Sequence, residues 1–253
     1  LSKSMASASG LYNINKNSWV RTSDNFPNIE FPEVVDNKTN IFGVIKINEN
    51  EVPIYGCIGD LQASLLSIDL ADNMINVNLG TGSQVSKNYK LGDENNFELR
   101  PTFGNNYFTT ISHIPCGRVL DLFSKLFNQI SDLNGGRKDI FWELFLSKSN
   151  TDEEKIFEVD LNLFKGSNNY KLGGYIKNIN ESNFNLETLV DSIKFSLISQ
   201  YSEIIETMQV RSQSKFENIL ITGALAKKIT DFSDLLSKKT GIKTEVIDHD
   251  YDV

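Results

Sequence analysis

The hydrophobic residues of this 253-residue chain recur with two periods, one typical of helices and one typical of strands. The most regular helical pattern runs from Leu186 to Met208 and keeps one apolar face, with Asn185 at the cap position. A second apolar stripe predicts a helix over Pro115–Ile130, with Pro115 at the first helical position, where its missing N–H costs nothing. Shorter helices are expected at Ala63–Ile68, Asp139–Lys148 and Ala226–Lys239, the last with Gly241 as its C-cap.

Apolar or alternating runs predict strands between these helices. They lie at Ile41–Ile47, Val52–Ile58, Asn73–Val85, Phe97–Phe103, Tyr107–Ile111, Glu217–Thr222 and Ile242–Ile247. A long amphipathic helix packs well across a sheet, so the combination indicates an α/β fold.

Composition narrows the function classes. Net charge is −8 and no cluster of Lys or Arg occurs, which argues against nucleic acid and anionic membrane surfaces as partners. Two cysteines and two histidines are too few for a disulfide framework or a structural zinc site. No apolar run has the length of about 18 residues that a membrane helix needs. The simplest interpretation is a protein of a reducing, cytoplasmic compartment.

Two short motifs about twenty residues apart carry the candidate chemistry. Asp60 follows Gly59 at the start of a predicted helix, and Gly80-Thr81-Gly82 ends a predicted strand. Phosphoryl transfer needs a carboxylate to orient the attacking hydroxyl and backbone N–H groups to hold phosphate oxygens, so the pair suits a phosphotransferase. Alone, Asp60 could simply be an N-cap, and the glycine turn could be an ordinary hairpin.

These motifs resemble the second domain of the FGGY carbohydrate kinases. The resemblance rests on Gly59–Ser64, which reads GDLQAS and is most similar to the sedoheptulokinase branch, and on Asn78–Ser83, which reads NLGTGS. It implies an α/β fold of the actin-like ATPase (ribonuclease H-like) class, with a mixed sheet flanked by helices. It also implies that residues 1–48 end the family's first domain and that residues 49–253 form most of its second, without the last helix.

The resemblance assigns roles to individual residues. Asp60 would be the general base and would contact the sugar together with Gln62. Gly80, Thr81 and Gly82 would meet the phosphates of ATP. The adenosine would lie against Gly223, Ala224 and Lys227, although this chain has a single glycine at Gly223 and carries Thr222 where the family usually has another.

The implied activity is ATP-dependent phosphorylation of a terminal hydroxyl of a ketose, with sedoheptulose as the first candidate. Its partners would be the small-molecule sugar, ATP and Mg²⁺, and the oligomeric state stays open. The family's Asp-x-Gly-Thr motif, which binds magnesium and phosphates, does not occur here, so no metal ligand is assigned and the chain alone is expected to be inactive. Alternatives are another FGGY substrate (xylulose, ribulose or glycerol) and an inactive actin-like nucleotide-binding module. The acidic run at residues 248–253 is interpreted as a solvated tail and not as a metal site.

Overall fold

The computed structural model describes residues 1–20, 29–35, 41–133, 135–165 and 173–247. The acidic run at residues 248–253 lies outside the described residues. The chain divides into two compact units. The first unit contains Leu1–Leu70 and Asn88–Thr110, and the second contains Ala71–Lys87 and Ile111–Asp252. No helix in the described ranges combines the length and the apolar character needed to cross a bilayer.

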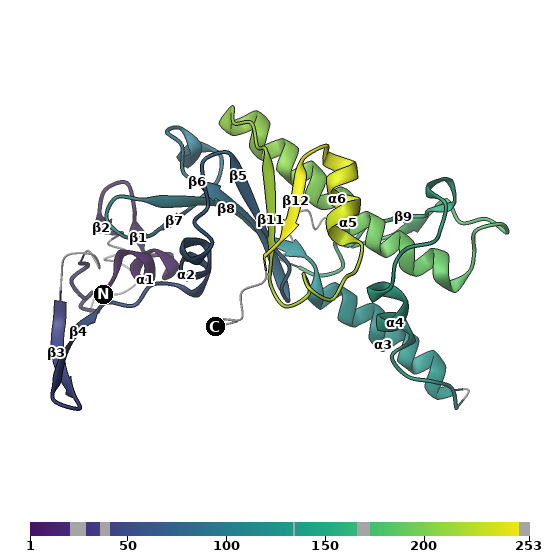
Figure 1. Cartoon of the computed structure of the whole chain (residues 1–253), viewed down its shortest axis with the longest axis horizontal. Coiled ribbons are helices and arrows are strands. Elements are labelled where there is room, and N and C mark those ends of the chain that lie inside the picture. Colours follow the sequence, from purple (N-terminus) through teal and green to yellow (C-terminus); the bar gives the residue numbers. More distant parts are fainter. Residues whose placement is uncertain (21–28, 36–40, 134, 166–172, 248–253) are drawn as a thin grey trace. The chain divides into compact units, whose positions relative to one another are not determined.

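The second unit is built on a mixed sheet (Figure 1). Its strands follow the order β12 (Lys243–Val246), β11 (Asn218–Thr222), β5 (Met74–Asn78), β6 (Gly82–Asn88) and β8 (Tyr107–Pro115). β11 pairs in parallel with β12 and β5, whereas β5 and β6 are antiparallel. Ile75, Val77, Ile219 and Ile221 are completely buried, so the two central strands carry the core.

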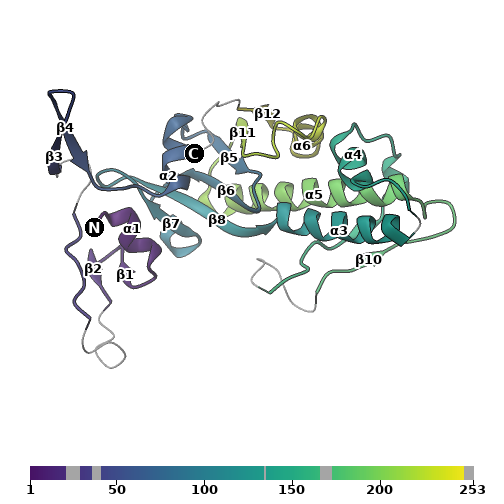
Figure 2. The same ribbon diagram turned by 90° about the horizontal axis from the view of Figure 1, so that it is seen from below.

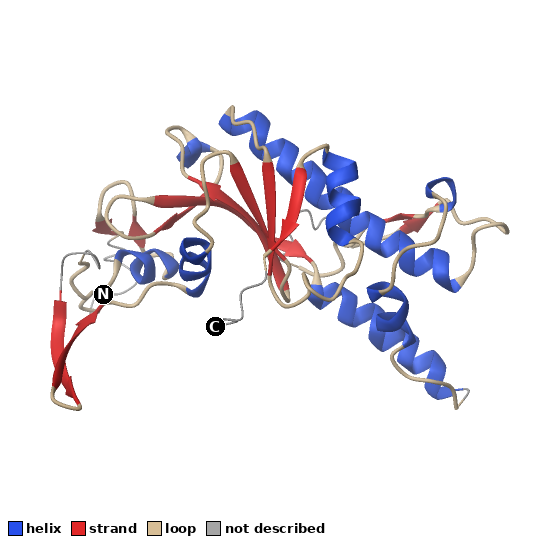
Figure 3. Cartoon of the chain, in the orientation of Figure 1, coloured by secondary structure: helices blue, strands red, loops and turns tan. Residues whose placement is uncertain are grey.

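Four helices accompany this sheet in the described part of the second unit, and Figure 3 shows them in blue. They are α3 (Gly117–Leu133), α4 (Ile140–Leu146), α5 (Leu186–Ser212) and α6 (Phe232–Thr240), with a short η2 turn at Glu153–Lys155. α4 packs against both α3 and α5 (Figure 2), and α6 packs against α5 and β12. A small antiparallel ribbon, β9 (Glu158–Val159) and β10 (Ile176–Lys177), lies against α5 through β9.

Two helix caps of the second unit, the N-cap of α5 and the C-cap of α6, are formed by the residues predicted for them. The Asn185 side chain accepts a hydrogen bond of 2.9 Å from the amide of Thr188, which confirms the predicted N-cap of α5. Gly241 ends α6 with φ of +70°, a conformation that costs glycine little, and confirms the predicted C-cap.

The first unit contains short elements. They are α1 (Lys3–Ala8), β1 (Tyr12–Asn13), β2 (Ser18–Trp19), β3 (Ile41–Ile47), β4 (Asn50–Tyr55), α2 (Asp60–Ser67), η1 (Asp93–Asn95) and β7 (Glu98–Pro101). β1 pairs with β2, β3 with β4, and β7 with the first half of β8, all antiparallel. The expected domain boundary at residue 48 falls in the turn of the β3–β4 hairpin, inside this unit, and stays a prediction.

Three predicted elements differ from the structure. The strand expected over Asn73–Val85 is two strands, because the chain reverses at the glycine turn. Pro115 ends β8 and does not begin α3, which starts at Gly117. The helix expected at Ala226–Lys239 begins only at Phe232.

The late start of α6 has a physical cause in a buried ion pair. The Asp231 carboxylate accepts hydrogen bonds from the Lys194 ammonium at 2.9 Å and from the amide of Ser149 at 2.7 Å. Lys194 is completely buried and also donates to the carbonyl of Ser147 at 2.6 Å. Thr230 donates from its amide to the carbonyl of Leu146 at 3.3 Å. These contacts hold the residues just before α6 against α4 and α5, and the preceding residues form single turns and no continuous helix.

Candidate active site

The Gly80-Thr81-Gly82 turn joins β5 to β6 in the second unit. The Ser83 hydroxyl donates to the carbonyl of Asn78 and closes the turn. Thr81 and Gly82 are exposed. Within the described residues, the amides of Gly80 and Thr81 donate to no protein acceptor. The turn therefore offers unpaired N–H groups at the surface, which is what an anionic ligand needs.

The start of α3 holds this turn from one side. The amide of Gly117 donates to the carbonyl of Gly80 at 3.1 Å, and the amide of Arg118 donates to the carbonyl of Thr81 at 2.9 Å. A Cβ atom at position 117 would lie 2.9 Å from the carbonyl oxygen of Gly80 and 3.1 Å from Cα of Thr81. Only glycine allows this approach. Because α3 engages the turn's carbonyl groups, the turn's N–H groups stay available.

The turn after β11 holds the same segment from another side. The amide of Leu79 donates to the carbonyl of Thr222 at 2.7 Å, and the amide of Leu225 donates to the carbonyl of Leu79 at 3.3 Å. Gly223 has φ of +99°, and a Cβ atom there would lie 2.6 Å from the carbonyl oxygen of Leu79. The predicted adenosine turn is therefore in direct backbone contact with Leu79, the residue that leads into the predicted phosphate turn.

The other residues predicted to meet adenosine lie on this second turn. Ala224 and Lys227 are exposed. Thr222 is buried and accepts a hydrogen bond of 3.0 Å from the Asn76 side chain on the neighbouring strand β5. The Thr222 side chain therefore makes a contact within the sheet. The contacts of Gly223, Ala224 and Lys227 with a nucleotide stay predictions.

Two buried titratable side chains, Cys116 and Tyr201, belong to the same unit. Burial raises the pKa of the Cys116 thiol to about 11, and it also raises the pKa of the Tyr201 phenol well above its ordinary value. Both groups are therefore neutral at physiological pH. The side chain of Gln200, next to Tyr201 on α5, donates to the carbonyl of Pro115 at 3.1 Å and supports the passage from β8 into α3.

Asp60 lies in the first unit as the first residue of α2. Gly59 is the N-cap of α2, but Asp60 bonds to one of the free amides of the first turn, so the alternative of a purely capping role for Asp60 stays open. The Asp60 carboxylate accepts a 2.7 Å hydrogen bond from the amide of Leu61 and is exposed. A negative charge is favourable in the first turn of a helix. Asp60 is accordingly an accessible carboxylate on a fixed element, as a general base must be.

A buried serine on α1 fixes the start of α2. The Ser4 hydroxyl accepts hydrogen bonds from the amide of Gly59 at 3.1 Å and from the side-chain amide of Gln62 at 2.9 Å. Gln62 also donates to the carbonyl of Pro101 at 3.2 Å and is buried. These bonds give Gln62 a structural role within the first unit, and its predicted contact with the sugar is untested.

Sequence reasoning missed two of these positions, Ser4 and Gly117. A glycine in the first turn of an apolar helix lowers helix propensity, so Gly117 carried a signal of close backbone approach. Ser4 carried none, because one serine beside a run of small residues has no periodic meaning. Among the residues that the structure describes, no three His, Cys, Asp or Glu side chains come together to hold a metal ion.

Comparison with known proteins identifies the fold. No protein-family model and no curated protein matches the sequence. The structure is similar to that of the xylulose kinase from Bifidobacterium adolescentis, with a TM-score of 0.70 and 17% sequence identity over 99% of this chain and 52% of that chain. The glycerol kinase from Plasmodium falciparum, solved with ADP, gives a TM-score of 0.70 and 18% identity over 98% of this chain and 51% of that chain.

A third structure gives the same result. The gluconate kinase from Lactobacillus acidophilus matches with a TM-score of 0.68 and 12% identity, over 98% of this chain and 52% of that chain. This chain thus spans about half the length of the kinases that it matches. The likeness confirms the predicted fold class: the chain has the α/β fold of the sugar kinases, which is the actin-like ATPase fold with a mixed sheet flanked by helices.

Proposed function

We propose that this chain is the C-terminal part of an ATP-dependent carbohydrate kinase of the FGGY family. The observation that carries the proposal is the convergence of three backbone segments, the turn at residues 80–82, the turn at Gly223 and the start of α3, around N–H groups without a protein acceptor. Backbone N–H groups at a glycine turn beside a helix N-terminus bind phosphate well. The fold shared with sugar kinases supports the same assignment.

The residues divide the chemistry between the two substrates. Asp60 orients a terminal hydroxyl of the sugar and accepts its proton as the oxygen attacks the γ-phosphorus of ATP. The N–H groups of Gly80 and Thr81 bind oxygens of the terminal phosphates, and Gly82 keeps the turn open. Gly223, Ala224 and Lys227 form the surface for the adenosine.

Magnesium neutralises charge on the transferred phosphoryl group in such kinases. Among the described residues, no three His, Cys, Asp or Glu side chains come together. We therefore assign no residue of this chain to Mg²⁺ and derive no step from it.

The preferred substrate is sedoheptulose, with another ketose or a polyol as the nearest competitor. The sequence form GDLQAS at Gly59–Ser64 supports sedoheptulose, because the resemblance to the sedoheptulokinase branch is carried by these residues. The kinases of similar structure are named for xylulose, glycerol and gluconate, so the test must span ketoses, polyols and sugar acids.

A coupled ATP assay of the complete gene product across that panel tests the proposal. Asp60→Asn should reduce sugar phosphorylation by at least about a hundredfold and leave ATP affinity, measured by calorimetry, within about twofold, because general-base catalysis contributes about 10²–10⁴-fold. Asp69→Asn is the matched control: it removes an exposed carboxylate from the same unit, and Asn tolerates the φ of +47° found there. Full turnover by Asp60→Asn would remove Asp60 from the base role.

An inactive nucleotide-binding module is the second candidate function. It is favoured by the single glycine of the turn after β11, where Thr222 replaces a usual glycine. ATP binding without turnover of any sugar in the panel would support this alternative over the kinase.

A further inference from the structure

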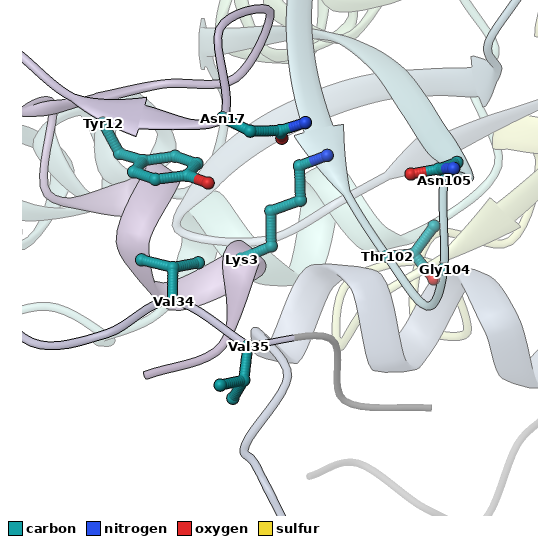
Figure 4. Close-up of a pocket in the computed structure, with 8 residues that line it drawn as sticks. All are labelled: Lys3, Tyr12, Asn17, Val34, Val35, Thr102, Gly104 and Asn105. Carbon is teal, nitrogen blue, oxygen red and sulfur yellow. The ribbon is translucent and has the colours of Figure 1, made fainter. Parts of the chain in front are cut away.

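The first unit contains a cavity of about 230 Å³ that no part of the proposed kinase chemistry uses. Its walls come from α1, from the β1–β2 hairpin, from the segment before β3 and from the β7–β8 turn (Figure 4). The lining residues are Lys3, Tyr12, Asn17, Val34, Val35, Thr102, Gly104 and Asn105. The cavity is thus assembled from segments far apart in the sequence.

Lys3 supplies the only charge among the residues that line this cavity. Its ammonium donates a 2.5 Å hydrogen bond to the hydroxyl of Tyr107 and lies 4.9 Å from the centroid of that ring. No carboxylate of the described residues is within ion-pair distance of it. An ammonium group has three donors, so two of them remain for a ligand.

The other polar lining groups are also donors. Thr102 accepts the amide of Phe103 at its hydroxyl oxygen, which leaves the hydroxyl proton to be donated. Within the described part of the chain, the side chains of Tyr12, Asn17 and Asn105 make no hydrogen bond with another protein group. Burial, and then the neighbouring Tyr107, raise the pKa of the Tyr12 hydroxyl, so it keeps its proton. Figure 4 shows Lys3 reaching between the β1–β2 residues and the β7–β8 turn.

We propose that this cavity binds a phosphate group, either as inorganic phosphate or as the ester of a small metabolite. The negative charge of a phosphate would pair with the Lys3 ammonium, and its oxygens can accept hydrogen bonds from several converging donors at once. Val34 and Val35 give the wall an apolar part against which a short carbon skeleton fits. The volume is below the 300–1,000 Å³ or so of typical pockets for drug-sized ligands, so the ligand is smaller than a nucleotide.

Calorimetric titration of the 253-residue chain tests the proposal at constant ionic strength, with inorganic phosphate, ribose 5-phosphate, ribose and acetate as probes. Phosphate and ribose 5-phosphate should bind, whereas ribose and acetate should bind at least tenfold more weakly. Tighter binding of ribose 5-phosphate than of phosphate identifies an ester site, and equal binding identifies a site for phosphate alone. Acetate binding as tight as phosphate binding would overturn the assignment.

Variants locate the binding. Asn17→Asp places a carboxylate in the cavity with little change in shape, at a φ of +47° that Asp also tolerates, and should raise the phosphate Kd at least tenfold. Lys3→Met should do the same through loss of the ammonium. Asn15→Asp is the matched control, since it adds the same charge in the same β1–β2 turn outside the lining, and should change Kd by less than twofold. Phosphate binding that survives Asn17→Asp but is abolished by saturating ATP belongs to the 80–82 turn and would overturn the proposal.

Discussion

Replacing Gly223 by alanine tests whether the nucleotide site depends on backbone contact between two turns. The residue has φ of +99°, and the new Cβ atom would lie 2.6 Å from the carbonyl oxygen of Leu79 and 2.9 Å from its carbonyl carbon. Both atoms belong to the backbone that leads into Gly80, so neither can rotate away as a side chain would. The turn after β11 and the phosphate turn must therefore separate.

The size of the effect follows from three terms. A left-handed backbone costs a non-glycine residue about 1–2 kcal/mol. Overpacking against rigid neighbours costs about 1–3 kcal/mol. The lower entropy of the unfolded alanine chain offsets about 0.4–1 kcal/mol. Gly223→Ala should therefore reduce the free energy of unfolding by about 3 kcal/mol.

A second glycine of the same unit, Gly241, distinguishes the cost of the left-handed backbone from the cost of the steric contact. Gly241 also has positive φ, +70°, but nothing lies within 4 Å of a Cβ atom added there. Gly241→Ala should therefore cost only about 1 kcal/mol, because the backbone term acts alone. Gly117→Ala provides the converse case, in which a Cβ atom 2.9 Å from the carbonyl oxygen of Gly80 adds crowding without a positive φ.

Urea unfolding at equilibrium measures these differences as shifts of the midpoint at a common slope. Calorimetry with ATP measures the second consequence: Gly223→Ala and Gly117→Ala should weaken ATP binding at least tenfold, and Gly241→Ala should leave it within twofold. If Gly223→Ala is no more destabilising than Gly241→Ala and binds ATP normally, the contact with Leu79 does not shape the site.

Two further predictions concern residues that support the fold around the site. Ser4→Ala removes the acceptor of the Gly59 amide and of the Gln62 side chain, so it should lower the free energy of unfolding by about 1–3 kcal/mol, measured in urea. It should also reduce kcat of the complete protein, because Asp60 is held less firmly, whereas Ser7→Ala in the same helix should leave kcat unchanged. Burial disfavours the charged form of Asp231, but hydrogen bonds from the Ser149 amide and from Lys194 outweigh it and hold the pKa of that carboxyl below its ordinary value. The ionised carboxyl therefore stabilises the fold above its unfolded pKa of about 3.9, and this contribution is lost as pH falls below that value through the folded pKa. Asp231→Asn should therefore make the free energy of unfolding less dependent on pH between pH 6 and pH 2. An unchanged pH dependence in this range would contradict the assignment.

The predictable elements are those in which one period persists without interruption. The apolar pattern of α5 persists to Met208, four residues before the helix ends at Ser212, and Asn185 caps the helix; the buried run of β11 was predicted to within one residue. The start of α6 could not be predicted, because the chain from Ala226 to Asp231 has helical spacing. Its path is set instead by Lys194, which lies on another helix 37 residues away in sequence. A pattern in sequence cannot report a partner of that kind.

The candidate site shows the same limit at single residues. The motifs at Gly59–Ser64 and Asn78–Ser83 carry the resemblance because their residue types are unusual together. Gly117 matters only through the carbonyl groups of Gly80 and Thr81, which approach it from another part of the chain. Gln62 stands within a motif and is nevertheless engaged by Ser4 and Pro101, so a position in a motif does not show that a side chain meets a substrate.

Threonine is tolerated at position 222 because the backbone crowding occurs at the next residue, Gly223. A glycine is required only where backbone approaches backbone, and the contact with Leu79 is made at position 223. The Thr222 side chain points away from that contact into the sheet, where it accepts the Asn76 amide, and Asn76 also donates to the carbonyl of Leu220 at 3.1 Å. A threonine here therefore ties β5 to β11 next to the two turns. One glycine is sufficient for the close approach, and the residue before it is free to strengthen the strands that position the phosphate turn.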